Sequence, residues 1–174
     1  RCWNTMSQLI FKTVHGSHLY GLSNIDSDID TFWVGTQINK RVEHYYNAVE
    51  RTDLASVGIT RFLFLAKTGS HQSVEALMSR EKIWNPAFQN VFSPMLDNLK
   101  VCGAEVFEKY ERTIKAFCFG DFKHRRHAVR LSQNLEALRD CGRFNPRMNE
   151  AQINDANFMA EHYEGADLFQ KLMD

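Results

Sequence analysis

Two aspartates near the start of the chain have the type and spacing that metal chemistry requires. Asp28 and Asp30 open the segment DIDTFWV, residues 28–34, which first alternates acidic and apolar residues and then becomes apolar, a pattern that predicts a β-strand. Side chains two positions apart on a strand point to the same face, roughly 6 to 7 Å apart. Two carboxylates placed in this way can hold one or two divalent cations, as two-metal phosphoryl chemistry requires.

Gly16 and Ser17 lie upstream of the acid pair, directly after LIFKTV at residues 9–14, a β-branched and aromatic segment that predicts a strand. A loop at this point could hold phosphate oxygens through backbone N–H groups and a hydroxyl, and glycine allows the backbone to approach closely. Each feature alone is common in turns and solvated loops. The combination of a strand, Gly-Ser and an acid pair opening a second strand indicates a metal and phosphate site.

Three other interpretations of the acidic segment fail. Asp26, Asp28 and Asp30 imitate the first ligands of an EF-hand, but Thr31 stands where that loop needs glycine and Gln37 where it needs glutamate. Haloacid-dehalogenase-type phosphatases carry their DxD motif at the end of an apolar strand, whereas the apolar run here follows the acids. Neither a P-loop nor a GxGxxG motif occurs, so Walker-type and Rossmann nucleotide binding are unsupported.

The cysteines give no metal or disulfide signature. They are far apart in the sequence and form no CxxC pair, so we expect free thiols in a reducing cytoplasm: Cys2, Cys102, Cys118 and Cys141. A zinc set can be assembled from Cys118, His124, His127 and Cys141, but its spacing fits no common zinc finger, and His127 is better explained as part of a basic helix row.

Composition narrows the class of protein. The 174 residues contain 21 Lys plus Arg and 21 Asp plus Glu, and this balance argues against coating nucleic acid through global charge. The longest apolar run is far shorter than the roughly 20 residues of a membrane span. The start RCWNTMSQ lacks a signal-peptide pattern, so we expect Met6 to be the natural initiator behind five added residues. A cytoplasmic location is expected, in the host cytoplasm if the protein is phage-encoded, with no membrane partner.

Strands come early in the chain and helices late. A third strand is expected within residues 49–57, and Pro86 and Pro94 punctuate a region expected to be a connection. The predicted helices, read from apolar residues at helical spacing, cover residues 59–68, 73–80, 97–119 and 124–141, with a helical tail from about 148 onward. This order predicts an α+β fold, in which a small mixed β-sheet is followed by a helical C-terminal half.

The stretch GSHLYGLSNIDSDID, residues 16–30, resembles the signature of the polymerase-β-type nucleotidyltransferase superfamily, hG[GS] followed further on by Dh[DE]h. It is especially similar to a bacterial and phage branch written roughly as GS-x-x-Y/F-G-L-x-x-x-x-SD-I-D. The matching residues are Gly16, Ser17, Tyr20, Gly21, Leu22, Ser27, Asp28, Ile29 and Asp30. The resemblance implies a catalytic core over residues 6–82 and a helical region, residues 83–174, packed on it.

Two further segments extend the resemblance. The branch has a third aspartate before a helix of the type L-x-K-F-x-x-L-A-x-x-G-N-P-x-x-x-E-x-L, and residues 53–78 follow that layout with Asp53 at the third position. Glu50 is the alternative third acid, and the sequence departs from the branch at Ser70-His71, where Asn-Pro is common. KHRRHAVRL, residues 123–131, is similar to the helix K-x-x-H-x-x-R-L of the same proteins, and CGRFNP resembles its G-x-x-x-P exit.

The last of these segments predicts two rows on one helix. Helical spacing aligns Lys123, His127, Arg130 and Asn134 in one row beside an apolar row that contains Ala128, Leu131, Leu135 and Leu138. We expect the apolar row to pack and the polar row to face outward. That polar row is either an ordinary solvated face or a surface for a triphosphate or a nucleic-acid backbone, and the resemblance favours a ligand for Lys123 and Arg130.

The resemblance implies a nucleotidyltransferase that uses Mg²⁺ or Mn²⁺ to transfer a nucleoside monophosphate from an NTP to a hydroxyl. In this interpretation Asp28, Asp30 and Asp53 are the metal ligands and catalytic residues, and Asp53 could accept the proton of the acceptor. Gly16, Ser17, Lys123 and Arg130 would bind the NTP, and Tyr20 either stacks on its base or packs the loop. The acceptor stays open among a nucleic-acid end, a protein and a small molecule. The alternatives are an inactive nucleotide-binding regulator or antitoxin-like protein, and a helical interaction module that binds no nucleotide.

Overall fold

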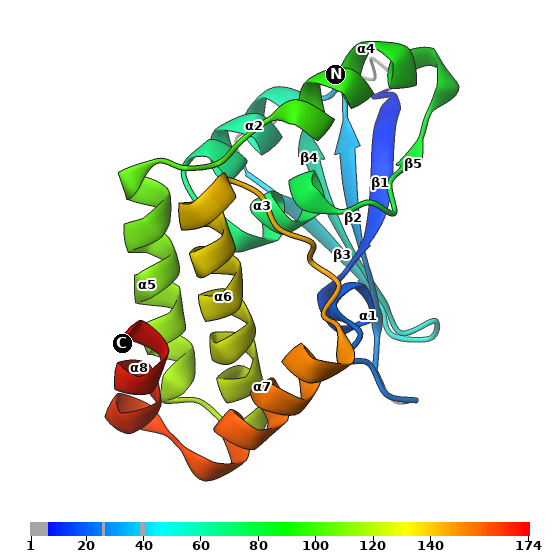
Figure 1. The fold of residues 1–174 in the computed structure, drawn as a ribbon. Helices are drawn as coiled ribbons and strands as arrows, with labels where there is room; N and C mark the ends of the chain where they lie inside the picture. Colours follow the sequence, from blue (N-terminus) through cyan, green and yellow to red (C-terminus); the bar gives the residue numbers. More distant parts are fainter. Residues whose placement is uncertain (1–6, 26, 39–40) are drawn as a thin grey trace.

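A mixed β-sheet forms the N-terminal part of the fold, as the sequence predicts (Figure 1). The computed structural model describes residues 7–25, 27–38 and 41–174, so the expectation for Met6 and the residues Cys2 and Asp26 lie outside it. The strands are β1 Leu9–His15, β2 Ile29–Gly35, β3 Glu43–Asn47, β4 Thr52–Gly58 and β5 Ile83–Trp84. Their order across the sheet is β3-β4-β2-β1-β5, with β2 and β4 parallel and the other neighbours antiparallel.

Helices make up most of the C-terminal part, which confirms the α+β class. They are α1 Gly16–Tyr20, α2 Ile59–Lys67, α3 His71–Met78, α4 Pro86–Asn98, α5 Ala104–Cys118, α6 Phe122–Cys141, α7 Glu150–His162 and α8 Gly165–Met173. The long helix α6 begins where the Asp121 side chain accepts a hydrogen bond from the His124 N–H, and it ends at Gly142, whose φ of 72° only glycine adopts at little cost. Within the described chain, no helix is both long and apolar enough to cross a membrane.

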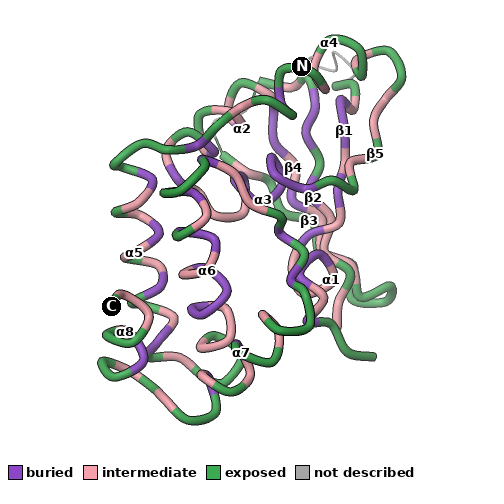
Figure 2. The backbone as a smooth tube through the Cα atoms, viewed as in Figure 1, coloured by how far each residue is buried: buried purple, intermediate pink, exposed green. Residues whose placement is uncertain are grey.

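The two faces of the sheet differ in burial because side chains alternate along each strand. The covered face packs against helices and contains buried Phe11, Thr13 and His15 on β1, Phe32 and Val34 on β2, and Ala55 and Val57 on β4. The opposite face, here called the open face, contains only exposed or half-buried residues: Lys12, Val14, Ile29, Thr31, Trp33, Glu43, Tyr45, Asn47, Thr52, Leu54, Ser56 and Ile83. Figure 2 shows the buried stretches along β1 and α6.

The segment that follows α6 runs back toward the short helix α1 (Figure 1). There the Met148 N–H donates to the Tyr20 carbonyl oxygen at 3.2 Å, and α7 packs against α6. The buried residues of the sheet and those of α5 and α6 belong to one hydrophobic cluster, which contains both Phe32 and Leu131. One hydrophobic core therefore spans the sheet and the C-terminal helices, and the division near residue 82 stays a prediction.

Several local expectations were wrong. The region around Pro86 and Pro94 is the helix α4 rather than a connection, because Pro86 stands in its first turn and the Asn85 side chain caps it. Residues 97–103 do not belong to the following helix, which begins at Ala104, since Leu99 is extended. The strands β3 and β5 and the short helix α1 were not predicted. Cys102, Cys118 and Cys141 are free thiols, as expected.

Candidate functional site

One cavity gathers every residue that the sequence assigned to a site. Its volume is about 770 Å³, and it lies between α1, the first residues of β2 and β4, the start of α3 and the first half of α6. The predicted residues among its lining are Gly16, Ser17, Tyr20, Asp28, Asp30, Asp53, Lys123 and Arg130. Glu50, the alternative third acid, does not line it; that residue lies on the turn between β3 and β4. Asp53 is therefore the better placed third carboxylate.

Strand register brings Asp30 and Asp53 together. The two residues are direct partners on the parallel strands β2 and β4, and His15 on β1 and Tyr46 on β3 continue the same row across the sheet. The Oδ1 atom of Asp53 is buried without a hydrogen-bond partner, and the His44 Nδ1 lies 3.8 Å from it. A carboxylate oxygen shielded from water and left without a donor is costly, so it favours a ligand that would bind it.

Gly16 makes room for the Asp30 carboxylate. A Cβ atom at position 16 would overlap the Asp30 Oδ2, and the φ of Gly16 is 63°, in the left-handed region that favours glycine. The chain can therefore leave β1, turn into α1 and pass directly over the acid without a side chain between them. This close approach explains why the residue before Ser17 is glycine.

The carboxylates repel one another. Burial, followed by the negative charges of Asp53 and Asp28, raises the pKa of Asp30 above its usual range, while the positive charge of Lys123 acts in the opposite direction. The protein thus leaves a concentration of negative charge at this end of the cavity. A bound cation would relieve it.

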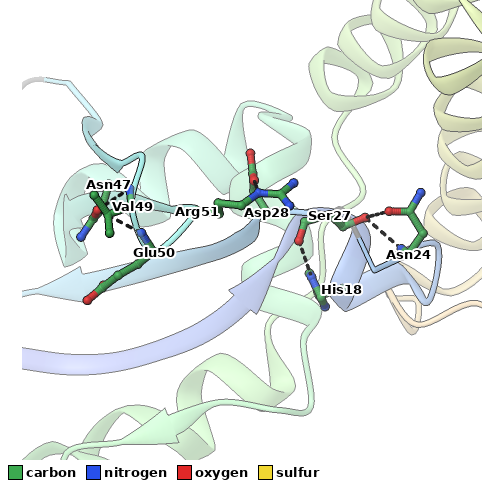
Figure 3. A network of polar contacts seen from close by, with 8 residues as sticks. All are labelled: His18, Asn24, Ser27, Asp28, Asn47, Val49, Glu50 and Arg51. Atoms are coloured by element: carbon green, nitrogen blue, oxygen red, sulfur yellow. Dashed lines mark hydrogen bonds and ion pairs between the residues drawn. The ribbon is translucent and has the colours of Figure 1, made fainter.

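Asp28 has a cationic partner in the turn between β3 and β4 (Figure 3). The Arg51 Nε donates to Asp28 Oδ1 at 2.9 Å, and the Arg51 carbonyl oxygen accepts the Ile29 N–H at 2.9 Å. Arg51 has a φ of 51°, unusual for a residue other than glycine, and the turn is held by the Asn47 Oδ1, which accepts the N–H groups of Val49 and Glu50. The turn therefore fixes the start of β2 beside the start of β4.

The residues fit a divalent cation in their chemistry. Carboxylate oxygens are the ligands that Mg²⁺ prefers, Asp53 has an unpartnered buried oxygen, and Gly16 leaves a cradle beside Asp30. In the described part of the chain, no three His, Cys, Asp or Glu residues already stand close enough together to hold a metal ion. The Asp28 carboxylate, paired with Arg51, would have to turn from that pair to become a third ligand.

A buried ion pair forms the floor of the cavity. Arg130 on α6 pairs with Glu75 on α3, the Tyr20 Oη donates to Glu75 Oε2 at 2.5 Å, and the Arg130 guanidinium lies 3.6 Å from the centre of the Tyr20 ring. Burial is the largest influence on Glu75 and acts to raise its pKa, but the charge of Arg130, the neighbouring His71 and His15 and the hydrogen bond from Arg130 together lower that pKa to about 2. Tyr20 therefore packs and anchors α1, the second of the two roles considered for it.

The polar row of α6 faces inward, contrary to expectation. Arg130 and Asn134 are both buried, and only the beginning of the row, at Lys123, is exposed. The reason is that α6 is covered by α5 on one side and by α7 on another, so its core-facing surface is wider than one apolar row. Lys123 lines the cavity from its rim, and Arg130 reaches it only as part of the buried pair.

Neutral imidazoles surround this floor. Burial lowers the pKa of His15 to about 4 and that of His127 to about 3, and it also lowers the pKa of His71. His15 and His127 each lie edge-on to the Tyr20 ring, at 6.2 and 5.8 Å between ring centres. The inner end of the cavity is therefore aromatic and uncharged apart from the Glu75–Arg130 pair, whereas its outer end is acidic.

Sequence reasoning missed several lining and supporting residues. Glu75 was not singled out, although a lone acid inside the apolar segment SVEALM signals a buried, paired charge. His71, at the departure from the Asn-Pro pattern, begins α3 and lines the cavity. The hypothetical zinc set does not assemble, because Cys141 lies at the opposite end of the 20-residue helix α6 from His124.

No protein-family model matches the sequence, and no curated protein matches it significantly.

Proposed function

We propose that this chain is a nucleotidyltransferase that transfers a nucleoside monophosphate from an NTP to a hydroxyl acceptor and releases pyrophosphate. The observation that carries the proposal is the in-register pair of Asp30 and Asp53 on parallel strands, beside a glycine turn that no larger residue could occupy. Asp53 contributes an oxygen without a donor, and Asp28 lines the same cavity. Three carboxylates next to a Gly-Ser turn match the residue types that two-metal phosphoryl transfer requires.

Asp28, Asp30 and Asp53 would hold Mg²⁺ or Mn²⁺. When bound, the cation stabilises charge on the phosphoryl oxygens and lowers the pKa of the acceptor hydroxyl. Asp53 accepts the hydroxyl proton while the acceptor oxygen forms its bond to the α-phosphorus. The bond between that phosphorus and the oxygen bridging to the β-phosphate breaks, and pyrophosphate leaves with the electron pair.

The other lining residues bind and orient the substrate. Gly16 and Ser17 would meet phosphate oxygens through backbone N–H groups and a hydroxyl, and Lys123, which lines the same cavity from α6, would offset the charge of the leaving pyrophosphate. The buried cluster of Tyr20, Glu75 and Arg130 fixes α1, and with it the Gly-Ser turn, relative to α6. These residues position the phosphates, which is most of what phosphoryl transfer asks of a protein.

A second candidate is a nucleotide-binding regulator or antitoxin-like protein without turnover. The observation that favours it is the Asp28–Arg51 ion pair, because an acid already paired with a guanidinium is a weaker cation ligand. The two candidates share a cavity and differ in whether Asp28 leaves Arg51 to complete a metal site. Nucleotide binding without transfer would indicate the regulator, and a protein that binds no nucleotide would be an interaction module.

The proposal is tested with NTPs labelled at the α-phosphate, Mg²⁺, and pools of RNA, protein and small molecules as acceptors. We expect label to move to one pool, and we expect Asp28→Asn and Asp53→Asn to reduce transfer more than about 100-fold, since even groups behind metal ligands cost 10- to 100-fold. Glu50→Gln is the matched control: it removes a nearby acid that does not line the cavity, and it should keep full transfer.

Thermal melting of each variant shows whether it is folded. Transfer by a folded Asp28→Asn variant at the wild-type rate would refute the assigned metal site. A melting shift with NTP and Mg²⁺ but no transfer to any pool would favour the regulator.

A further inference from the structure

The open face of the sheet is unusually apolar for a surface. Val14, Ile29, Leu54 and Ile83 lie on it, and Trp33 and Tyr45 are 36% and 57% exposed. No described helix covers these residues, because the helices pack on the alternate side chains of the same strands. Exposed apolar side chains gathered on one face of a sheet favour association with another surface.

Charge on this face is sparse and arranged in one row. Strand register places Ile83, Lys12, Trp33, Ser56 and Glu43 directly beside one another across β5, β1, β2, β4 and β3. Lys12 and Glu43 are the charged residues among the described members of the face, and they stand on either side of the pair of central strands. The next row, Val14, Thr31, Leu54 and Tyr45, contains no charge at all.

We propose that the open face is the interface with a second copy of this chain, packed sheet against sheet. A two-fold axis parallel to the strands and midway between β2 and β4 places β1 of each copy over β3 of the other, and β2 over β4. This rotation keeps each row of residues at the same position along the strand direction in both copies. It therefore sets Lys12 opposite Glu43 twice, once on each side of the axis.

The apolar row obeys the same rotation. Val14 comes to lie opposite Tyr45, and Thr31 opposite Leu54, so the apolar groups of this row bury one another beside the row that holds the two ion pairs. Two sheets packed face to face lie about 10 Å apart with their strands nearly aligned, which suits side chains of this size. A surface that is complementary to itself in both charge and apolar character fits a two-fold dimer better than an unrelated partner.

The charged side chains of Lys12 and Glu43 each have a contact within the monomer. The Lys12 Nζ lies 5.8 Å from the centre of the Trp33 ring, and the Tyr45 Oη donates to Glu43 Oε2 at 3.0 Å. Each charged side chain thus lies along the surface of the sheet and has an aromatic neighbour. The Gln37 Nε2 donates a hydrogen bond to the Ser56 Oγ at 3.0 Å, so Ser56, the polar uncharged residue of the charged row, is already hydrogen-bonded.

Analytical ultracentrifugation of the full chain over a range of concentrations tests the interface. We expect a monomer–dimer equilibrium in which Lys12→Glu and Glu43→Lys each raise the dissociation constant by at least about tenfold, because each sets like charges opposite one another. Lys12→Glu combined with Glu43→Lys restores opposite pairs and should return the constant to within about threefold of wild type. Lys67→Glu, an equal charge reversal at the end of α2, is the control and should change nothing.

The charge exchange makes the result specific to this geometry. A wild-type protein that stays monomeric at every concentration overturns the proposal, as does a double variant that associates no better than the single ones. Thermal melting confirms that each variant is folded. Lys12 and Glu43, the residues exchanged in this test, do not line the cavity, so this outcome is independent of whether the cavity transfers nucleotides.

Discussion

Opposite charges are paired at the floor of the cavity, whereas like charges lie close together at its rim. At the floor, Glu75 and Arg130 have side chains 0% and 2% exposed, and each neutralises the other. At the rim, Asp28, Asp30 and Asp53 keep their negative charges close together, with only partial relief from Arg51 and Lys123. A charge that is compensated inside the fold stabilises structure, whereas one left uncompensated stabilises a bound ligand.

The two regions are mechanically connected through α1. Gly16 at the start of this helix lies against the Asp30 carboxylate, and Tyr20 at its end donates to Glu75. The compensated pair therefore fixes the element that shapes the uncompensated one. If this distinction is correct, substitutions at the floor should change stability strongly, and substitutions at the rim should change it little.

The largest effect is expected from Arg130→Met. Removing one partner leaves the Glu75 charge buried and unpaired, which should lower the free energy of unfolding by about 3 to 5 kcal/mol. Urea denaturation followed by circular dichroism measures it. Arg139→Met is the matched control, because the Arg139–Glu111 pair is half exposed, and its loss should cost less than about 1 kcal/mol.

A companion variant separates the pair from its packing. Arg130→Met together with Glu75→Leu removes both charges and should recover part of the lost stability, since an apolar pair of similar volume can replace a buried ion pair. Equal losses from Arg130→Met and Arg139→Met would contradict the contrast between floor and surface.

A loss of stability of intermediate size is expected when the pH is lowered. The pKa of Glu75 is about 2, below its ordinary value, so its contribution to stability is complete above about pH 4.5 and is lost as the pH falls toward 2. His15 and His127, with pKa values of about 4 and about 3, are held neutral, so folding is opposed as the pH falls from about 6.5 through these values. Protonation of each of these three groups destabilises the folded state, so the melting temperature should fall steadily between pH 6.5 and pH 3.

Replacement of one imidazole sharpens this test. His127→Phe keeps an aromatic ring among Tyr20 and Phe117 and removes a group that must be neutral to stay buried. Its melting temperature should decline less on acidification than that of the wild type. A decline of the same steepness would show that His127 does not contribute to the acid response.

The sequence predicted the acidic rim much better than the floor. Strands carry side chains to a face by simple alternation, so Asp28 and Asp30 could be expected on one face. Asp53, the register partner of Asp30, was placed with them only by the family resemblance. Glu75 and Arg130 are 55 positions apart and meet only through the packing of α3 against the core beside α6. A single sequence does not encode that meeting in any local pattern.

The errors in the fold have related causes. The row of Arg130 and Asn134 was expected outside because helical spacing identifies rows without saying how many neighbours cover them, and α6 is covered on more than one side. The strand β3 is exposed along its whole length, so it lacks the alternation by which a half-buried strand is recognised. The two-residue strand β5 is too short to give any signal.

The smallest effect on stability is expected from Asp30→Asn, and its sign is opposite to that of Arg130→Met. The substitution removes one of three mutually repelling charges and keeps the side-chain shape that Gly16 packs against. Without divalent cations it should therefore raise the free energy of unfolding. The increase should be no more than about 1 kcal/mol, because the site is open enough for solvent to screen the charges. Glu136→Gln, at an exposed position inside α6 and away from its ends, is the control and should leave stability nearly unchanged. Addition of Mg²⁺ should then reverse the order, because the wild type gains a ligand that the variant binds weakly. A variant less stable than wild type in the absence of cations would mean that the Asp30 charge is already compensated within the fold, and the contrast between rim and floor would fail at the residue where it should be clearest.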